Sequence, residues 1–401
     1  MEISENGLKD AFFPDLGVVR CETFSKVYPV MNNYILSHKE WEQSRDGMVK
    51  EMLDIKTNVL NPYRRCVGGL GRDINIFFLL AEAMWIFSGR KDVRFLTYFN
   101  AKMADFSDYG EVFHAPYGFR LRHAGVRSED KFTEENLHAA QGSDQIACAV
   151  RVFSNNPNSR QVVLSIWNHD FDLGIASKDI PCNDMVMLKI RNGKLITTIQ
   201  NRSNDLHWGL PTNLFQFSFL TEMIAGILGI ELGTQTHNSQ SLHLYEWNDI
   251  ANSMFTRFKT ETNKVDLYDV SGERKVDFNF VSDVPNNRLR ELDIIINYII
   301  ESLTNVAEGK EVSKETETII EAFSTYLFNA YKLLSFYLQY KAEFKKAGSK
   351  EEKEAIRSNY LGKIEILAKE KNCETQDIFV LAMNFFATRL SNYVHPYLGK
   401  L

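Results

Sequence analysis

The stretch DMVMLKIRNGKLITTIQ (184–200) decides the fold class, because it predicts two β-strands joined by a tight turn. Both flanks are rich in β-branched and other apolar residues, which favour strands. Asn192-Gly193 lies between them and is the preferred pair for a two-residue type I′ turn. The sequence therefore predicts a β-hairpin at this point.

The segments on either side of the hairpin add further strands and long apolar helices. QVVLSIW (161–167) and HNSQSLHLYEW (237–247) are typical of strands, and residues 22–60 are expected to be helical and then irregular. Two stretches predict largely buried helices: INIFFLLAEAMWIFSG (74–89), and NLFQFSFLTEMIAGILGI (213–230), which ends in glycine. We expect an α/β (α+β) fold with a mixed sheet.

The pattern changes at about Pro285. From there to the last residues, apolar positions recur with helical periodicity and charged residues fill the other faces. AGSK (347–350) is typical of a turn between helices. We therefore divide the chain into a catalytic domain, 1–284, and an all-helical C-terminal extension, 285–401.

Composition excludes several classes of protein. The chain has 401 residues and a net charge of -6, so no overall positive field attracts nucleic acid and we expect no direct nucleic-acid binding. The first residues lack the basic and apolar regions of a secretory signal, and no run of about 18 apolar residues predicts a membrane span. Five scattered cysteines without CxxC spacing argue against disulfides and zinc. We expect a cytoplasmic protein.

Cys182, in DIPCND, is the candidate nucleophile, although a lone cysteine is more often a buried and inert thiol. The polar stretch QNRSNDLHWGLPTN (200–213) follows and separates two apolar segments. It could be a solvated loop, or it could form the wall of a site in which Arg202 and Ser203 bind a phosphate. An arginine beside a thiol lowers the pKa of the thiol and favours the thiolate.

Several motifs occur in an order and spacing that resemble a known family. NPNSRQVVLSIWN, IPC, GKLITTIQNRSNDLHWGLPTN and SLHLY resemble the signature blocks of thymidylate synthases and the related pyrimidine hydroxymethylases, over roughly residues 25–250. The resemblance implies a homodimer whose subunits pack sheet against sheet. It also implies dUMP as substrate and 5,10-methylenetetrahydrofolate as co-substrate. His237 and His243 lack an evident third ligand, so we expect no metal.

The resemblance also implies a role for each matching residue. Cys182 would add to C6 of the pyrimidine, Glu82 would organise water and proton transfers, and Tyr117 would assist removal of the C5 proton. Glu82 lies in so apolar a segment that we expect it to be buried, with its pKa raised toward neutrality. The residues expected to hold the nucleotide are Arg45, Arg160 (lent across the dimer interface), Arg202, Ser203, Asn213, His243 and Tyr245. Those expected at the folate are Asp205, Gly209, Trp208 and Glu82.

Asn213 and Asn100 bear on the base and the product. The amide of Asn213 can accept from N3–H and donate to O4 of uracil, whereas enzymes of the group that act on cytosine carry aspartate there. Helix N-capping is an alternative role for Asn213. In NAKMAD (100–105), Asn100 and Met103 replace two tryptophans of the WDEWAD-like segment with which synthases shield the reacting carbon. We expect Asn100 to admit and orient water.

Other departures from the synthase pattern favour hydroxymethylation. Asn183 follows the nucleophile in place of histidine, and Gln161 stands where synthases usually have a second arginine. Because the chain continues into helices where synthases end in a closing tail, closure must occur differently; Trp208 could supply an aromatic wall. The resulting hypothesis is a dUMP hydroxymethylase of the kind known from phages, acting in the host cytoplasm. The alternatives are methylation to dTMP, hydroxymethylation of a cytosine nucleotide, or a non-catalytic homologue. For the helical extension three roles stay open: enlarging the dimer interface, covering the active site, or recruiting another protein.

Overall fold

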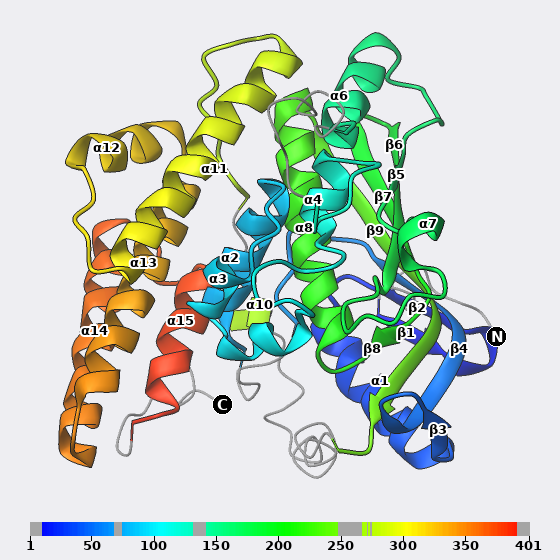
Figure 1. Ribbon diagram of the computed structural model, residues 1–401, viewed down its shortest axis with the longest axis horizontal. Helices are drawn as coiled ribbons and strands as arrows, with labels where there is room; N and C mark the ends of the chain where they lie inside the picture. The colour runs from blue at the N-terminus through cyan, green and yellow to red at the C-terminus, as the bar shows by residue number, and fades with distance from the viewer. Residues whose placement is uncertain are drawn as a thin grey trace.

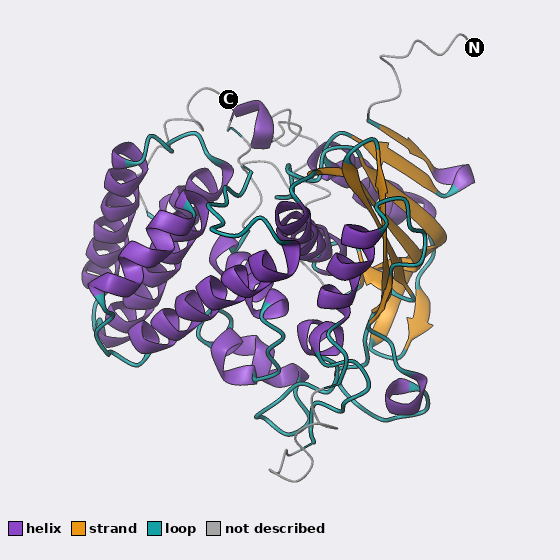
Figure 2. Cartoon of the chain, turned by 90° about the horizontal axis from the view of Figure 1, so that it is seen from above, coloured by secondary structure: helices purple, strands orange, loops and turns teal. Residues whose placement is uncertain are grey.

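A mixed sheet at one side of the molecule carries most of the helices on one of its faces (Figures 1 and 2). The computed structural model describes residues 10–67, 74–130, 142–247, 267–270, 272 and 275–390. Within these residues the strands form one nine-stranded sheet of order β1-β2-β4-β9-β7-β6-β5, with β3 paired to β4 and β8 to β9. The strands are β1 (Ala11–Phe13), β2 (Val18–Cys21), β3 (Glu42–Ser44), β4 (Gly47–Val59), β5 (Val163–Ser165), β6 (Asn183–Arg191), β7 (Lys194–Asn201), β8 (Asn204–Asp205) and β9 (Glu231–Tyr245). The predicted α/β class is confirmed.

The predicted hairpin is present as β6 and β7, which pair antiparallel through Arg191 and Lys194. Asn192 and Gly193 both have positive φ, 52° and 69°, as a type I′ turn requires. β7 then pairs in parallel with β9, and β9 pairs antiparallel with β4. The hairpin therefore lies between the edge strand β5 and the long strand β9.

The expectation of irregular structure before residue 60 was wrong for β4, a central strand of 13 residues. Asp54 has φ 55° and interrupts the strand's alternation, so that Met52 and Ile55, three positions apart, are both buried. A pattern search with period two fails at such a position. The preceding residues do form a helix, α1 (Phe24–His38).

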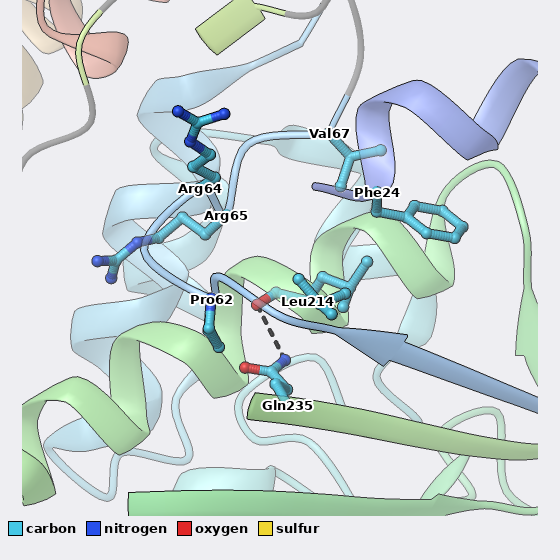
Figure 3. A pocket seen from close by; sticks show the side chains of 8 residues that line it. Phe24, Pro62, Arg64, Arg65, Val67, Leu214 and Gln235 are labelled. Atoms are coloured by element: carbon cyan, nitrogen blue, oxygen red, sulfur yellow. Dashed lines mark hydrogen bonds between the residues drawn. The ribbon is translucent and has the colours of Figure 1, made fainter. Parts of the chain in front are cut away.

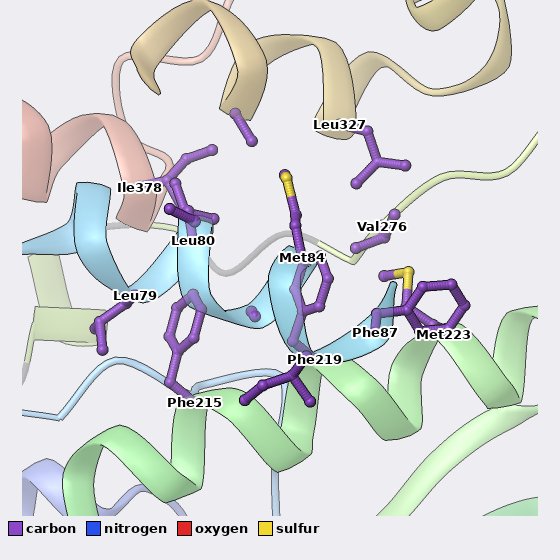
Figure 4. Packing of buried hydrophobic residues seen from close by; sticks show 14 of the residues in the cluster. Leu79, Leu80, Met84, Phe87, Phe215, Phe219, Met223, Val276, Leu327 and Ile378 are labelled. Atoms are coloured by element: carbon purple, nitrogen blue, oxygen red, sulfur yellow. The ribbon is translucent and has the colours of Figure 1, made fainter. Parts of the chain in front are cut away.

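Two buried helices separate the sheet from the C-terminal helices. α8 (Gly209–Leu228) packs against the sheet, and α2 (Ile76–Phe87) packs on α8. Figure 4 shows Met84 of α2 between Phe219 of α8 and Leu327 of the C-terminal helices. α8 ends, as predicted, at a glycine, Gly229, with φ 71°. It begins four residues earlier than predicted, so Asn213 lies inside the helix and does not cap it.

Shorter helices complete the part of the chain before residue 285. They are η2 (Pro14–Leu16), α3 (Val93–Thr97), η3 (Ala101–Phe106), α4 (Tyr117–Arg122), α6 (Gln145–Asn155), α7 (His169–Asp172) and α10 (Leu267–Val270).

The residues from 285 onward form helices, as the periodicity predicted, and these helices share a core with α2 and α8. They are α11 (Pro285–Ala307), α12 (Lys314–Phe323), α13 (Thr325–Lys346), α14 (Lys350–Glu370) and α15 (Asp377–Ala387). Both α13 and α15 pack directly on α2. A partly buried ion pair between Arg122 and Asp293, 2.7 Å, adds a polar link between α4 and α11. Among the helices that the structure describes, none is long and apolar enough to cross a membrane.

Candidate active site

One large cavity, of about 1290 Å³, lies between the sheet, α2 and the C-terminal helices. It exceeds the 300–1,000 Å³ or so of a typical small-molecule pocket, so it has room for two sizeable ligands. Its lining includes the predicted site residues Arg45, Asn100, Asp205, Trp208 and Tyr245. These five residues lie up to 200 positions apart in the sequence.

A second cavity, drawn in Figure 3, is far smaller, about 10 Å³. Gln235 of β9 points into it and donates a hydrogen bond to the carbonyl of Leu214, 3.2 Å. A volume of this size holds about one water molecule. It is a packing defect lined mainly by residues of the segment 59–67, together with one residue each from α1, α8 and β9, and it does not accommodate a substrate.

Cys182 lies immediately before β6 and is held from two sides. Its backbone N–H donates to the hydroxyl of Tyr117, 3.3 Å, and its Sγ lies 3.7 Å from Nη2 of Arg202. Arg202 also donates from Nε to the carbonyl of Pro181, 2.7 Å, and thereby clamps the loop that carries the cysteine. This geometry supports the predicted grouping of Cys182, Tyr117 and Arg202.

The expected lowering of the Cys182 pKa is wrong for this structure. Burial of the thiol raises its pKa above 9.0, and the opposing effect of the guanidiniums of Arg202 and Arg45 is smaller. Asp179, three residues before the cysteine, is itself buried, which raises its pKa to about 7, and its negative form also disfavours the thiolate. The thiol is therefore the resting form, and the two arginines reduce the cost of ionising it.

Tyr117 is positioned by a close approach between α4 and α2. A Cβ on the next residue, Gly118, would lie 2.0 Å from the carbonyl oxygen of Ile86, so only glycine permits this contact. Burial raises the pKa of Tyr117 well above 10.0. Its hydroxyl is consequently protonated beside Cys182.

Glu82 projects from α2, and Nε2 of Gln216 on α8 donates a hydrogen bond to its carboxylate. Its surface is only partly accessible, and desolvation raises its pKa to about 7. The sequence-based expectation of a raised pKa is confirmed. At neutral pH Glu82 can therefore either give or take a proton.

Asn213 lies on the first turns of α8, where its Nδ2 donates to Oδ1 of Asn204, 3.3 Å. Asn204 is buried at the start of β8 and donates in turn to Ser239, 3.3 Å. A Cβ at Gly209 would lie 2.9 Å from Oδ1 of Asn204, so glycine leaves room for this amide pair. Because this hydrogen bond uses one Nδ2 hydrogen of Asn213, it orients the amide and leaves its Oδ1 and its other Nδ2 hydrogen to bind a ligand.

Asn183 and Asn201 form a second buried amide pair, on the adjacent strands β6 and β7. Nδ2 of Asn183 donates to Oδ1 of Asn201, and Nδ2 of Asn201 donates to the carbonyl of Asn238, 3.1 Å. The Oδ1 of Asn183 is buried without a hydrogen-bond partner in the described structure. A buried unpaired acceptor of this kind costs stability, which points to a functional reason for keeping it.

Asn100 and Met103 both line the large cavity from η3. The Oδ1 of Asn100 accepts from the N–H of Lys102, 3.2 Å, and so begins η3. This contact orients the amide with its Nδ2 donors available for another partner.

Two tryptophans line the large cavity, and they come from a different part of the chain than Asn100 and Met103. Trp208 lines it and is 46% exposed, as expected for an aromatic wall. Trp247 also lines it and was missed by the sequence analysis, which read it only as the end of a strand; its ring stacks on Tyr245, with centroids 4.8 Å apart. Tyr245 in turn contacts His243 edge to face, 4.9 Å. Asp205 orders the turn before Trp208 by accepting from the N–H groups of His207, 2.6 Å, and Trp208, 3.1 Å.

The predicted phosphate residues are only partly brought together. Arg45 lines the cavity, is paired to Asp46 at 3.0 Å, and acts electrostatically on Cys182 together with Arg202. Ser203 is half-buried beside Arg202. Arg160 is exposed just before β5 and does not line the large cavity.

The chain belongs to the thymidylate synthase family: the family model matches residues 27–284, more than half of the chain. Among the curated relatives, the deoxyuridylate hydroxymethyltransferase of Bacillus phage SP01 is 41% identical over 203 residues, which are 50% of this chain and 51% of that protein. The protein of the same name from Pseudomonas phage M6 is 37% identical over 206 residues, 51% of this chain and 54% of its own. The thymidylate synthase of Bos taurus is 30% identical over 180 residues, 42% of this chain and 49% of its own. The match thus spans about half the length of these relatives.

Glu82 gives a pH-dependent prediction for stability. Because folding raises its pKa from 4.5 to about 7, the fold favours the protonated acid; that stabilisation is complete below about pH 4.5 and is lost as the pH rises to about 7. Relative to Glu82→Gln, the wild-type free energy of unfolding should fall over this interval by at most about 3 kcal/mol. Urea unfolding of both proteins across the interval measures this. If the difference in free energy of unfolding between the two proteins did not change with pH, the raised pKa of Glu82 would be contradicted.

Proposed function

We propose that this protein transfers the one-carbon unit of 5,10-methylenetetrahydrofolate to C5 of dUMP with addition of water, giving 5-hydroxymethyl-dUMP. The observation that carries the proposal is that Cys182 is held between Tyr117 and Arg202, and that Arg45, which lines the large cavity, acts electrostatically on its thiol. The names of the phage relatives support the same reaction.

The reaction begins with the sulfur of Cys182. Its thiolate adds to C6 of the pyrimidine, which makes C5 nucleophilic enough to attack the methylene carbon of the folate. Binding of the dianionic phosphate by Arg202 and Arg45 places C6 at the sulfur. The proton on C5 then leaves with help from Tyr117, and tetrahydrofolate departs from an exocyclic methylene.

Water then competes with hydride for that methylene. A synthase excludes water and takes hydride from the folate, which produces dTMP and dihydrofolate. Here the cavity wall has Asn100, whose amide can orient a water molecule, and Met103. Glu82, with its pKa of about 7, can take the proton from that water. Departure of the cysteine completes the cycle.

The alternative product, dTMP, is favoured by one observation: Trp208 and Trp247 could together shield the methylene from solvent. Incubation of the protein with dUMP and methylenetetrahydrofolate separates the two reactions. We expect tetrahydrofolate and a nucleotide heavier than dTMP by one oxygen atom, identified by mass spectrometry. Formation of dihydrofolate in step with dTMP would rule out hydroxymethylation.

We also propose that the catalytic unit is a homodimer formed through the open face of the sheet. Strand register places Val163, Met187 and Thr198 in one row on this face, while Val186 and Ile199, one position along, are buried on the helical side. Val163 is 45% exposed. A second copy on this face would bring Arg160, exposed just before β5, toward the phosphate of its partner.

Complementation tests the shared site. Arg160→Ala and Cys182→Ala are each expected to be inactive, and a mixture of the two should recover up to about a quarter of wild-type activity, because mixed dimers contain one intact site. Activity is measured as product formed after the two are mixed and exchanged. No recovery in exchanged dimers would show that each chain supplies its own complete site. We also propose that residues 1–284 form the catalytic domain and that residues 285–401 form a helical extension of it.

A further inference from the structure

The end of α15 forms part of the wall of the large cavity, although it lies outside the region that matches the family model. Phe385 and Arg389 line the cavity together with Asp205 and Trp208. This is the same cavity that holds the proposed folate site. The C-terminal helices therefore contribute side chains to the site itself.

Phe385 and Arg389 act as one unit. The guanidinium of Arg389 lies 3.8 Å from the centre of the Phe385 ring, and its Nη1 donates to the carbonyl of Phe385, 2.6 Å. The ring is fixed from behind by edge contacts with Phe77 of α2, 5.3 Å, and Tyr337 of α13, 5.6 Å. Such a stacked arginine is pre-organised, so little side-chain entropy is lost when it binds an anion.

The charges around the cavity orient an elongated ligand. Tetrahydrofolate has a pterin that donates N–H groups, a flat aminobenzoyl ring and an anionic glutamate. Asp205 suits the pterin and repels carboxylates. Arg45 is paired to Asp46, and Asp108 is held by Ser177 and the backbone of Lys178. Lys102, Lys178 and Asp105 also line the cavity. Arg389 adds positive charge to this wall, which suits the anionic glutamate.

We propose that Arg389, stacked on Phe385, binds the carboxylates of the glutamate of the folate co-substrate, and that Phe385 contacts its aminobenzoyl ring. This assignment rests on the proposed function. A guanidinium has five N–H donors, so it can hold the carbonyl at the end of α15 and a carboxylate at the same time. The helical extension then covers the folate end of the active site.

The competing role for Arg389 is purely structural, as a cation that closes the C-terminus of α15. Two ligands separate the roles: tetrahydrofolate, and tetrahydropteroate, which lacks the glutamate. Both are titrated into the dUMP-loaded full chain, with quenching of tryptophan fluorescence as the readout, since Trp208 and Trp247 line the cavity. Lys345→Gln is the matched control, because Lys345 is an exposed cation in the last turn of α13.

We expect Arg389→Gln to weaken tetrahydrofolate binding roughly tenfold, as for loss of a charge-assisted hydrogen bond, and to leave tetrahydropteroate binding unchanged. Lys345→Gln should change neither. Equal weakening of both ligands, or of neither, would overturn the assignment of Arg389 while leaving the proposed function intact. If the wild-type chain binds neither ligand, the proposed function itself fails, and this inference with it.

Discussion

Replacing Cys182 with alanine is expected to reduce product formation by roughly 10⁴-fold or more, the scale seen when the nucleophile of a covalent mechanism is removed. Without the sulfur, nothing adds to C6 and C5 does not become nucleophilic. The loss should appear in kcat, because the proposed phosphate ligands Arg202 and Arg45 are unchanged in this variant. Initial rates with dUMP and methylenetetrahydrofolate measure it, and mass spectrometry of the protein follows the covalent nucleotide adduct.

Cys148 provides a matched control for this experiment. Like Cys182 it is a half-buried free thiol near an arginine: Nη2 of Arg151 lies 3.1 Å from its sulfur. It is on α6, whereas Cys182 is held between Tyr117 and Arg202. Cys148→Ala should therefore keep near-normal activity. Turnover that survives in Cys182→Ala would refute a covalent mechanism through this residue.

The second large effect is expected at Asn213. An aspartate there cannot donate to O4 of uracil but can accept from the amino group of cytosine. Asn213→Asp should therefore shift the ratio of kcat/KM for dUMP to that for dCMP by roughly 10³-fold toward dCMP, because a buried unpaired polar group strongly disfavours the wrong base. Competition between the two nucleotides in one assay measures the ratio directly.

Two further variants separate base recognition from the packing of α8. Asn213→Ala removes both hydrogen bonds and should lower activity on both nucleotides without a comparable switch. Asn204→Ala removes the partner that holds the Asn213 amide at 3.3 Å, and should weaken discrimination by lowering activity on dUMP without raising activity on dCMP. An unchanged preference in Asn213→Asp would show that another group reads the base.

The local sequence predicted those parts of the fold in which one segment decides its own structure. Asn192-Gly193 determined the hairpin turn because its residues adopt positive φ readily, and the periodicity beyond Pro285 predicted the helices there. β4 was not predicted, because its alternation of buried and exposed residues breaks at Asp54. The start of α8 was misplaced because its first residues, Gly209 to Thr212, lack an apolar helical pattern and are held by tertiary contacts.

The site shows the same division. Cys182, Arg202 and Asp205 could be named from motifs, and the apolar neighbours of Glu82 were sufficient to predict its raised pKa, because desolvation depends mainly on burial. The pKa of Cys182 could not be predicted in this way. Its sign depends on how far burial and Asp179 outweigh two arginines, and those distances exist only in the folded chain.

By itself, then, the sequence determined the family and predicted the nucleophile and the residues that read the base, since these depend on side-chain chemistry at fixed spacing along the chain. Only the tertiary structure decided that Trp247 joins Trp208 at the cavity and that Phe385 and Arg389 of α15 line it. These residues come from segments without a shared motif. What brings them to one cavity is the burial of α2 between α8 and the C-terminal helices, a packing that no local pattern records.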